Sequence, residues 1–132
     1  MEYIAVDAQD LILVEAARDV IRRNYEDEKY TVGAAVVCPS GKIYVGVNID
    51  TCGFGPCAEP VALGAALCNG ERKFLTIVAA GGPHRNFGIM LPCGNCRQIL
   101  MDHAPDIMVI IDYQNRLVKV KLCDLLPLGY QE

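Results

Sequence analysis

The spacing of apolar and polar positions along the chain predicts three helices. Residues 7–24 repeat apolar side chains with a helical period, and Asp7 is placed to cap the first turn. Residues 58–69 and 94–103 give the other two helices. Pro60 does not argue against the second helix, because a proline in the first turn forfeits no intrahelical hydrogen bond.

Short apolar runs bounded by turn residues predict five strands, at residues 32–37, 43–48, 74–80, 107–111 and 117–121. Residues 81–92 are expected to form a long loop. The last two strands must be antiparallel, because the connection at 112–116 is too short for a parallel crossover. The order α-β-β-α-β-α-β-β predicts one mixed five-stranded sheet with helices on its faces, in a single domain spanning residues 1–132.

Composition narrows the classes of function. The 132 residues are 52% hydrophobic, and a mean hydropathy of +0.24 favours a sheet buried on both faces or an oligomer. No apolar run approaches the roughly 20 residues of a membrane span, and the start MEYIAVDAQD lacks the basic region of a signal peptide. A cytoplasmic protein without a membrane partner is expected. The net charge of −4 argues against a nucleic-acid partner and favours a small molecule.

Three of the seven cysteines fall at predicted helix starts. Cys57 precedes the second helix, and Cys93 and Cys96 open the third. Free N–H groups and the dipole at a helix N-terminus favour a thiolate. Two parallel strand–helix units would bring these N-termini together at the carboxyl ends of their strands. Zn²⁺ is the natural ion for converging sulfur ligands.

The number of ligands indicates a catalytic site. A structural zinc site closes with four protein ligands, whereas three leave a position for water. Glu59 lies two residues from Cys57 and is placed to take a proton from that water. The alternatives are unrelated core thiols, or a structural site closed by His84 or another cysteine. Cys52 is a weaker metal candidate; Cys38, Cys68 and Cys123 are interpreted as packing residues.

Five segments together resemble the cytidine deaminase family, in its form with three cysteine ligands. The similarity covers nearly the whole chain and implies a three-layer α/β/α fold with one Zn²⁺ per subunit. The segments are YTVGA (30–34), GVNID (46–50), CAE (57–59), PCGNCRQ (92–98) and LLP (125–127).

The resemblance implies roles for individual residues. Cys57, Cys93 and Cys96 would bind zinc, and Glu59 would shuttle protons during hydrolytic deamination of a cytosine-type base. Asn48 and Asp50 would hold the sugar hydroxyls, with Tyr30 beside the ring. For Asn48 and Asp50 the alternative is turn chemistry at the end of a hairpin, and for Tyr30 it is core packing. Family members generally form homotetramers, which is the assembly expected here.

The sequence departs from the usual family pattern at two places, one of which bears on the charge of the metal site and the other on the substrate. Pro60 stands where the family usually has an arginine that hydrogen-bonds the thiolates. Arg97 and the helix N-termini are the available charge compensation, although Arg97 could equally lie on the surface. The segment from Asn48 to Cys57 is also shorter than in typical cytidine deaminases. This length, GFGPCAE and the LLPLGY tail are more similar to blasticidin S deaminases.

Several functions therefore compete. The leading hypothesis is a zinc-dependent deaminase of cytidine or deoxycytidine, serving pyrimidine salvage. The runner-up acts on a modified cytosine nucleoside such as blasticidin S, serving detoxification. An RNA- or DNA-editing deaminase and a catalytically silent zinc-binding assembly protein are the other classes. Three aromatic residues could line the site, form an interface or simply pack: Phe54, Phe87 and Tyr130.

Overall fold

The computed structural model describes residues 1–51 and 55–131, and a mixed β-sheet runs through this part of the chain. Its strand order is β1-β7-β6-β4-β2-β3, and β5 pairs with β4. The β4–β6 pair is parallel, and the other pairs among the described strands are antiparallel. The strands are β1 (Ile4–Ala5), β2 (Val32–Val37), β3 (Ile43–Val47), β4 (Thr76–Gly81), β5 (Gly88–Met90), β6 (Met108–Tyr113) and β7 (Arg116–Lys121).

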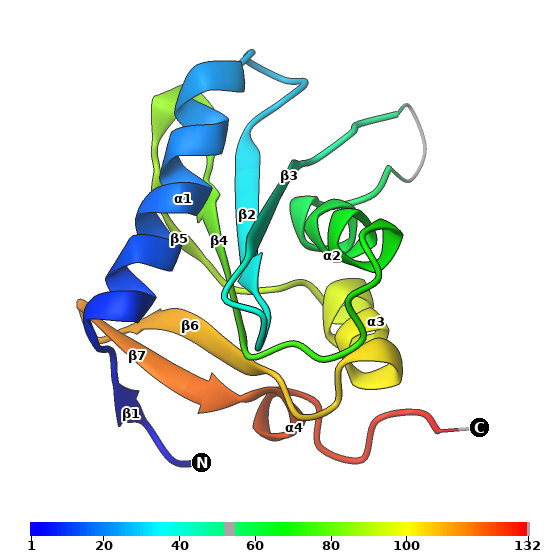
Figure 1. Cartoon of the computed structure of the whole chain (residues 1–132). Helices are drawn as coiled ribbons and strands as arrows, with labels where there is room; N and C mark the ends of the chain where they lie inside the picture. Colours follow the sequence, from blue (N-terminus) through cyan, green and yellow to red (C-terminus); the bar gives the residue numbers. More distant parts are fainter. Residues whose placement is uncertain (52–54, 132) are drawn as a thin grey trace.

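Helices cover both faces of the sheet. Helix α1 packs on one face, and α2 and α3 lie on the other (Figure 1). The described helices are α1 (Ala8–Asn24), α2 (Ala58–Cys68), α3 (Gly94–His103) and the one-turn α4 (Leu122–Leu125), with a 3₁₀ turn η1 (Pro83–Arg85). The predicted three-layer α/β/α arrangement is confirmed.

Successive residues of the strands alternate between two apolar cores, as the period of two along a strand requires. In β2, Ala35 belongs to the cluster beneath α1, whereas Ala34 and Val36 belong to the cluster beneath α2 and α3. In β4, Val78 belongs to the cluster beneath α1, and Ile77 belongs to the cluster beneath α2 and α3. The strands are therefore apolar on both faces, which accounts for the high hydropathy of the chain.

The five predicted strands are present, and two short strands extend the sheet. Strand β1 pairs with β7 at the edge and is only two residues long, too short to show a period. Strand β5 lies inside the predicted loop at 81–92 and folds back on β4 through Gly81 and Gly82, at φ of 152° and 132°. The antiparallel pairing of β6 with β7 confirms the expected direction of the last strand.

Helix α2 lies close against β3 because Gly46 has no side chain. A Cβ at position 46 would come within 2.5 Å of the backbone nitrogen of Ala62 in the helix. The helix axis can therefore approach the strand more closely than any other residue would allow. This contact fixes the depth of α2, and with it the position of the residues at its N-terminus.

The N-terminal helix begins with a reciprocal cap. The Asp7 carboxylate accepts from the Asp10 N–H at 2.9 Å, and the Asp10 carboxylate accepts from the Asp7 N–H at 2.9 Å. Asp10 also forms an ion pair with Lys119 of β7, with 3.0 Å between Nζ and Oδ2. The predicted cap at Asp7 is confirmed, and the ion pair ties α1 to the neighbouring strand.

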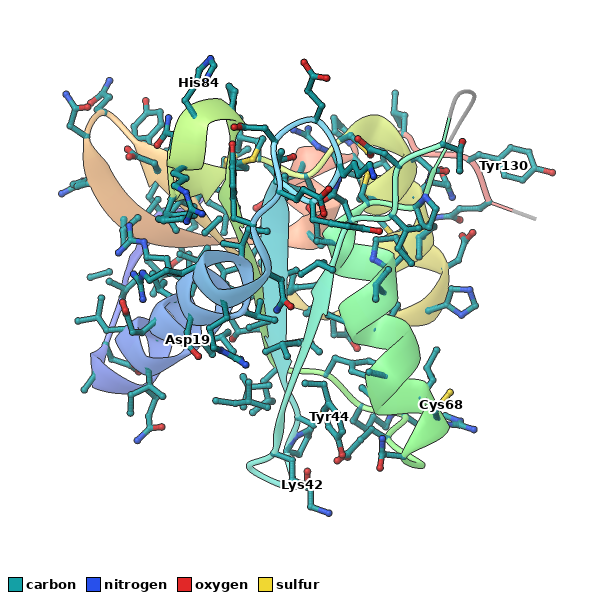
Figure 2. The ribbon with its side chains drawn as sticks, turned by 90° about the horizontal axis from the view of Figure 1, so that it is seen from above. Asp19, Lys42, Tyr44, Cys68, His84 and Tyr130 are labelled. Carbon is teal, nitrogen blue, oxygen red and sulfur yellow. The ribbon has the colours of Figure 1, made fainter. Side chains whose placement is uncertain are left out.

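Of the three cysteines interpreted as packing residues, one is buried and two are exposed. Cys38 is buried, as expected, but Cys68 and Cys123 are exposed. Cys68 is the last residue of α2 and points away from the sheet (Figure 2), and Cys123 lies in the single turn of α4. The packing interpretation is wrong for these two, because apolar composition alone does not say which side of a helix end faces the core.

Within the described chain, no helix is long and apolar enough to cross a bilayer.

Candidate active site

Two helix N-termini meet at one edge of the sheet. Strands β3 and β4 run in the same direction because each is antiparallel to β2. Helix α2 follows β3. Helix α3 follows the short β5, which pairs with the last residues of β4, so both helices begin near the ends of β3 and β4. Cys57 is the N-cap of α2 and Cys93 is the N-cap of α3. The predicted convergence of helix starts is present.

The three thiols are close enough to bind one metal ion. The Sγ atoms of Cys57 and Cys93 are 3.6 Å apart, and with Cys96 all three lie within 4.8 Å of one another. A tetrahedral zinc ion with bonds of about 2.3 Å spaces its sulfurs by about 3.8 Å, so this donor set fits Zn²⁺. Among the described residues this cluster has three members, and exposed His84 on η1 is not one of them.

The thiols are not equivalent. Burial would raise the pKa of Cys93, but hydrogen bonds from the Cys96 backbone N–H and from the other two thiols bring it below its usual value. Burial raises the pKa of Cys96, and the nearby Glu59 charge raises it further. Burial also raises the pKa of Cys57. The first turn of α3 thus stabilises one thiolate, and a bound cation would stabilise the other two.

Glu59 lies beside these sulfurs in the first turn of α2. Its side chain is buried, with 6% of the residue exposed. Burial raises the pKa of the carboxyl, although hydrogen bonds from its own backbone N–H and from the Cys96 thiol oppose this effect. A carboxyl group whose pKa is raised in this way takes up a proton more readily than an exposed glutamate does, which suits a group that accepts and returns protons.

A cavity of about 280 Å³ adjoins the thiols. No motif in the sequence marked Thr31, Ala79, Met90 or Leu91 as residues that line a cavity. Met90 and Leu91 come after the turn at Gly81 and Gly82. The short apolar run Ile89-Met90-Leu91 is the feature of the sequence that could have indicated buried residues here. The cavity is lined by Thr31, Val32, Asn48, Asp50, Gly55, Pro56, Cys57, Ala58, Glu59, Ala79, Met90, Leu91 and Cys93.

Asn48 organises one wall of the cavity. Its Oδ1 accepts from the backbone N–H groups of Thr31 and Val32, each at 3.0 Å. Its Nδ2 donates to the Lys29 carbonyl and to Asp50 Oδ1, each at 3.1 Å. These four bonds use the full hydrogen-bonding capacity of the amide. The side chain therefore joins β2 to the segment that carries Asp50.

The segment after β3 returns closely to the start of α2. The Ile49 N–H donates to the Pro56 carbonyl at 3.0 Å. A Cβ at Gly55 would lie 2.1 Å from the Ile49 carbonyl oxygen, so only glycine permits this approach. The close return brings Asp50 to the same cavity as Cys57. Cys52 and Phe54, which sequence analysis named as candidates, lie outside the described residues.

Other predicted residues are not among the described residues that line the cavity. Tyr30 pairs through its backbone with Glu26 and is not among the described residues that line the cavity. Arg97 donates from Nε to the Pro92 carbonyl and from Nη1 to the Leu125 carbonyl, each at 2.8 Å. Phe87 packs edge-on against Tyr25. Tyr130 is 71% exposed and projects from the C-terminal tail (Figure 2).

The fold and the thiol cluster define a metal-binding enzyme of the α/β/α class. Residues 7–111 match the model of the cytidine and deoxycytidylate deaminase zinc-binding region, and the chain belongs to this family of zinc-dependent deaminases. It is 39% identical over 137 residues to blasticidin-S deaminase from Bacillus cereus, covering 98% of each chain. It is 31% identical to cytidine deaminase from Mycobacterium tuberculosis, covering 75% of this chain and 71% of the relative.

Solved structures agree with this assignment. Cytidine deaminase from Burkholderia pseudomallei has a TM-score of 0.74 at 32% identity, covering 91% of this chain and 98% of that chain. Cytidine deaminase from Mycobacterium tuberculosis has a TM-score of 0.76 at 26% identity, covering 96% of this chain and 100% of that chain. The family resemblance that the sequence motifs predicted is confirmed.

Proposed function

We propose that this protein hydrolytically deaminates a cytosine-type nucleoside, such as cytidine or deoxycytidine, to the uracil nucleoside and ammonia. The observation that carries the proposal is the meeting of three thiols and one buried carboxyl at the edge of a cavity. Cys57, Cys93 and Cys96 would hold a zinc ion, which as a Lewis acid would lower the pKa of a water molecule bound to it.

Glu59 performs the proton transfers in this proposal. Its carboxylate accepts one proton from the attacking water and donates it to the ring nitrogen. It then accepts the second proton, from the hydroxyl now bonded to the ring carbon, and donates it to the amino group, which leaves as ammonia when its bond to that carbon breaks. Burial at the start of α2 raises its pKa, which suits a group that must both take and give a proton. The first turn of α2 places it two residues from Cys57, so carboxyl and metal reach the same water.

The substrate's sugar would lie along the wall formed by Asn48 and Asp50. The carboxylate of Asp50 would accept hydrogen bonds from sugar hydroxyls. Asn48 supports it through its bonds to β2 and to Asp50 Oδ1. Tyr30 remains a candidate for contact with the base, supported by the resemblance of its segment to the family motif and by its place next to Thr31, which lines the cavity.

A modified cytosine nucleoside is the second candidate substrate. It is favoured by the 39% identity to blasticidin-S deaminase from Bacillus cereus over 98% of each chain. Purified protein should be incubated separately with cytidine, deoxycytidine and blasticidin S while ammonia release is measured. Turnover of blasticidin S alone would favour detoxification, and turnover of cytidine or deoxycytidine would favour salvage.

Glu59→Gln tests the proton shuttle. The amide keeps the size of the side chain but cannot accept a proton, so we expect turnover to fall about 10²–10⁴-fold. Zinc content, measured by elemental analysis, should stay the same because the three thiols are untouched. Full activity in Glu59→Gln would show that another group moves the protons. Zinc-loaded wild-type protein that deaminates none of the three substrates would favour the catalytically silent alternative.

Arg97 is proposed to compensate thiolate charge from the start of α3. Its support is the hydrogen bond to the carbonyl of Pro92, which directly precedes Cys93. The second bond, to the Leu125 carbonyl, holds the guanidinium in this place. The residue directly after Glu59 is Pro60 and not an arginine, so Arg97 and the two helix N-termini share this role in the proposal.

We further propose that residues 1–132 form one domain, that four copies assemble, and that the protein acts in the cytoplasm. Assembly is supported by the apolar side chains of Met90 and Leu91, which remain 37% and 56% exposed beside the cavity. A reducing compartment is supported by the described cysteines, which are all free thiols.

A further inference from the structure

A cavity of about 460 Å³ lies at the end of the sheet opposite to the thiols. The parallel strands β4 and β6 both start at this end. Leu75, directly before β4, and Met108, at the start of β6, line the cavity. The other lining residues come from the connections α2–β4 and α3–β6 (Figure 1) and from the turn between β2 and β3. A space of this volume, bounded by three connections, suits a small organic molecule.

The described lining of this cavity carries more basic than acidic side chains. Arg72 and Lys73 come from the segment between α2 and β4, and His103 is the last residue of α3. Asp106, in the turn before β6, is the acidic residue among the described lining residues. The two permanent cations outnumber this acid even when the histidine is neutral. In a chain with a net charge of −4, this cavity therefore favours an anion.

The three basic side chains of this cavity form no ion pair with any described residue. Arg72 Nη1 donates to the carbonyls of Leu67 and Glu71, at 3.1 and 2.7 Å, which fixes the guanidinium at the end of α2. Its Nε and Nη2 donate to no acceptor within the described chain. The Glu71 carboxylate accepts instead from the hydroxyls of Ser40 and Tyr44. Donors of a positioned guanidinium thus remain available to a ligand.

Apolar groups supply another part of the lining. Leu75 is 49% exposed, although the strand that follows it is buried throughout. Pro39, from the β2–β3 turn, and Pro105, from the turn before β6, are exposed rings beside the same cavity. An apolar group placed here would remove the Leu75 side chain from water while its anionic group met Arg72 and Lys73.

We infer that this cavity is a second binding site, which takes a small phosphate monoester with an apolar organic part. The planar fork of Arg72 matches two phosphate oxygens, and Lys73 adds a point charge. A phosphate dianion balances these two permanent cations, whereas a carboxylate balances one of them. The cavity shares no lining residue with the one beside the thiols, so the inference does not rest on the proposed deamination.

Three probes test the anionic and the apolar parts of the site: phenyl phosphate, inorganic phosphate and benzyl alcohol. In calorimetric titrations of the zinc-loaded protein at constant ionic strength, phenyl phosphate should bind at least about tenfold more tightly than either of the others. Proton NMR locates the binding, because the chain has two histidines. The ring signals of His103 should shift, and those of His84, on η1 outside this cavity, should not.

Variants assign the binding to the basic side chains. Lys73→Gln should weaken phenyl phosphate binding about tenfold, whereas Lys73→Arg should retain most of the affinity. Lys42→Gln is the matched control: Lys42 projects from the connection between β2 and β3 (Figure 2), outside the cavity lining, so its loss should leave the affinity unchanged. Thermal melting shows whether each variant is folded.

The absence of saturable phenyl phosphate binding to the wild type would overturn the inference. So would an unchanged affinity in folded Lys73→Gln, or an NMR response at His84 without one at His103. Tighter binding of an acidic peptide or an oligonucleotide than of phenyl phosphate at this site would also overturn it, because the basic face would then serve a macromolecular partner.

Discussion

Individual side chains at the start of α2 have distinct roles that follow from their positions in one turn. Cys57 is the N-cap and directs its sulfur toward Cys93 and Cys96. Glu59 lies two residues further on, buried against the same sulfurs. Pro60 follows in the first turn, where its missing N–H costs no helical hydrogen bond. A short segment can thus bring a metal ligand and a carboxyl to one water.

The carboxylate of Glu71 gives a testable pH dependence of the stability of the fold. Glu71, just after α2, accepts from the Ser40 hydroxyl at 2.6 Å and from the Tyr44 hydroxyl at 3.0 Å. These bonds lower its pKa from the ordinary value of 4.5, with Ser40 the main cause. Because the pKa is lowered by folding, the bonds stabilise the protein above that value. The stabilisation is lost as the pH falls through the folded pKa.

We therefore expect Glu71→Gln to be less sensitive to acid than the wild type. Melting temperatures measured from pH 6 down to the acid limit should fall less steeply for the variant. Parallel curves for the two proteins would show that the hydroxyl bonds to Glu71 do not contribute to stability.

At the scale of elements, the position of α2 depends on its contact with β3. Gly46 lets the helix backbone approach the strand, and this sets where Cys57 and Glu59 stand relative to α3. The opposite side of the helix carries Gly64, where an added Cβ would meet nothing within 4 Å. Substitution by alanine is therefore expected to change the free energy of unfolding in opposite directions at the two glycines.

Gly46→Ala should destabilise the fold by about 1–3 kcal/mol because the methyl group would collide with the Ala62 backbone. Gly64→Ala is the matched control in α2 and should stabilise it by about 0.4–1 kcal/mol through the helix preference of alanine. Urea denaturation measures both changes. Equal effects of the two substitutions would mean that helix and strand are not in the tight contact described.

At the scale of the whole molecule, the thiol cluster joins two helices that are far apart in the sequence. Cys57 is the N-cap of α2 and Cys93 is the N-cap of α3. Strand β3, which precedes α2, and strand β4, which leads through β5 to α3, are separated by β2 in the sheet. A metal ion bound by both helices would stabilise this edge, since binding to the folded state alone adds to the free energy of unfolding.

Thiol alkylation followed by mass spectrometry should report this arrangement. In zinc-loaded protein we expect exposed Cys68 and Cys123 to react with iodoacetamide. Cys38 should remain protected, because it is buried and burial raises its pKa to about 11. After removal of zinc by a chelator, Cys93 should become reactive because it is exposed and its pKa is lowered. Rapid modification of Cys38 in the native protein would contradict the described burial.

The sequence by itself determined the order of elements and the chemistry. Apolar runs bounded by turn residues located the five longer strands, and the spacing of apolar positions together with helix-start signals located α1, α2 and α3. The motifs around Cys57 and Cys93 indicated three thiols that the structure brings within 4.8 Å of one another, because metal binding depends on residue type and spacing. The same information could not locate β1 or β5, which are too short to show a repeat.

Only the tertiary structure decided how the parts meet. It brought Asn48 into four hydrogen bonds and placed Asp50 beside it in the cavity lining. It put Cys68 and Cys123 on the surface and added Met90 and Leu91 to the cavity. These properties depend on contacts between segments distant in the chain, so no local pattern records them. The residue types set which bonds can form, and the packing of the sheet and helices selects the bonds that do.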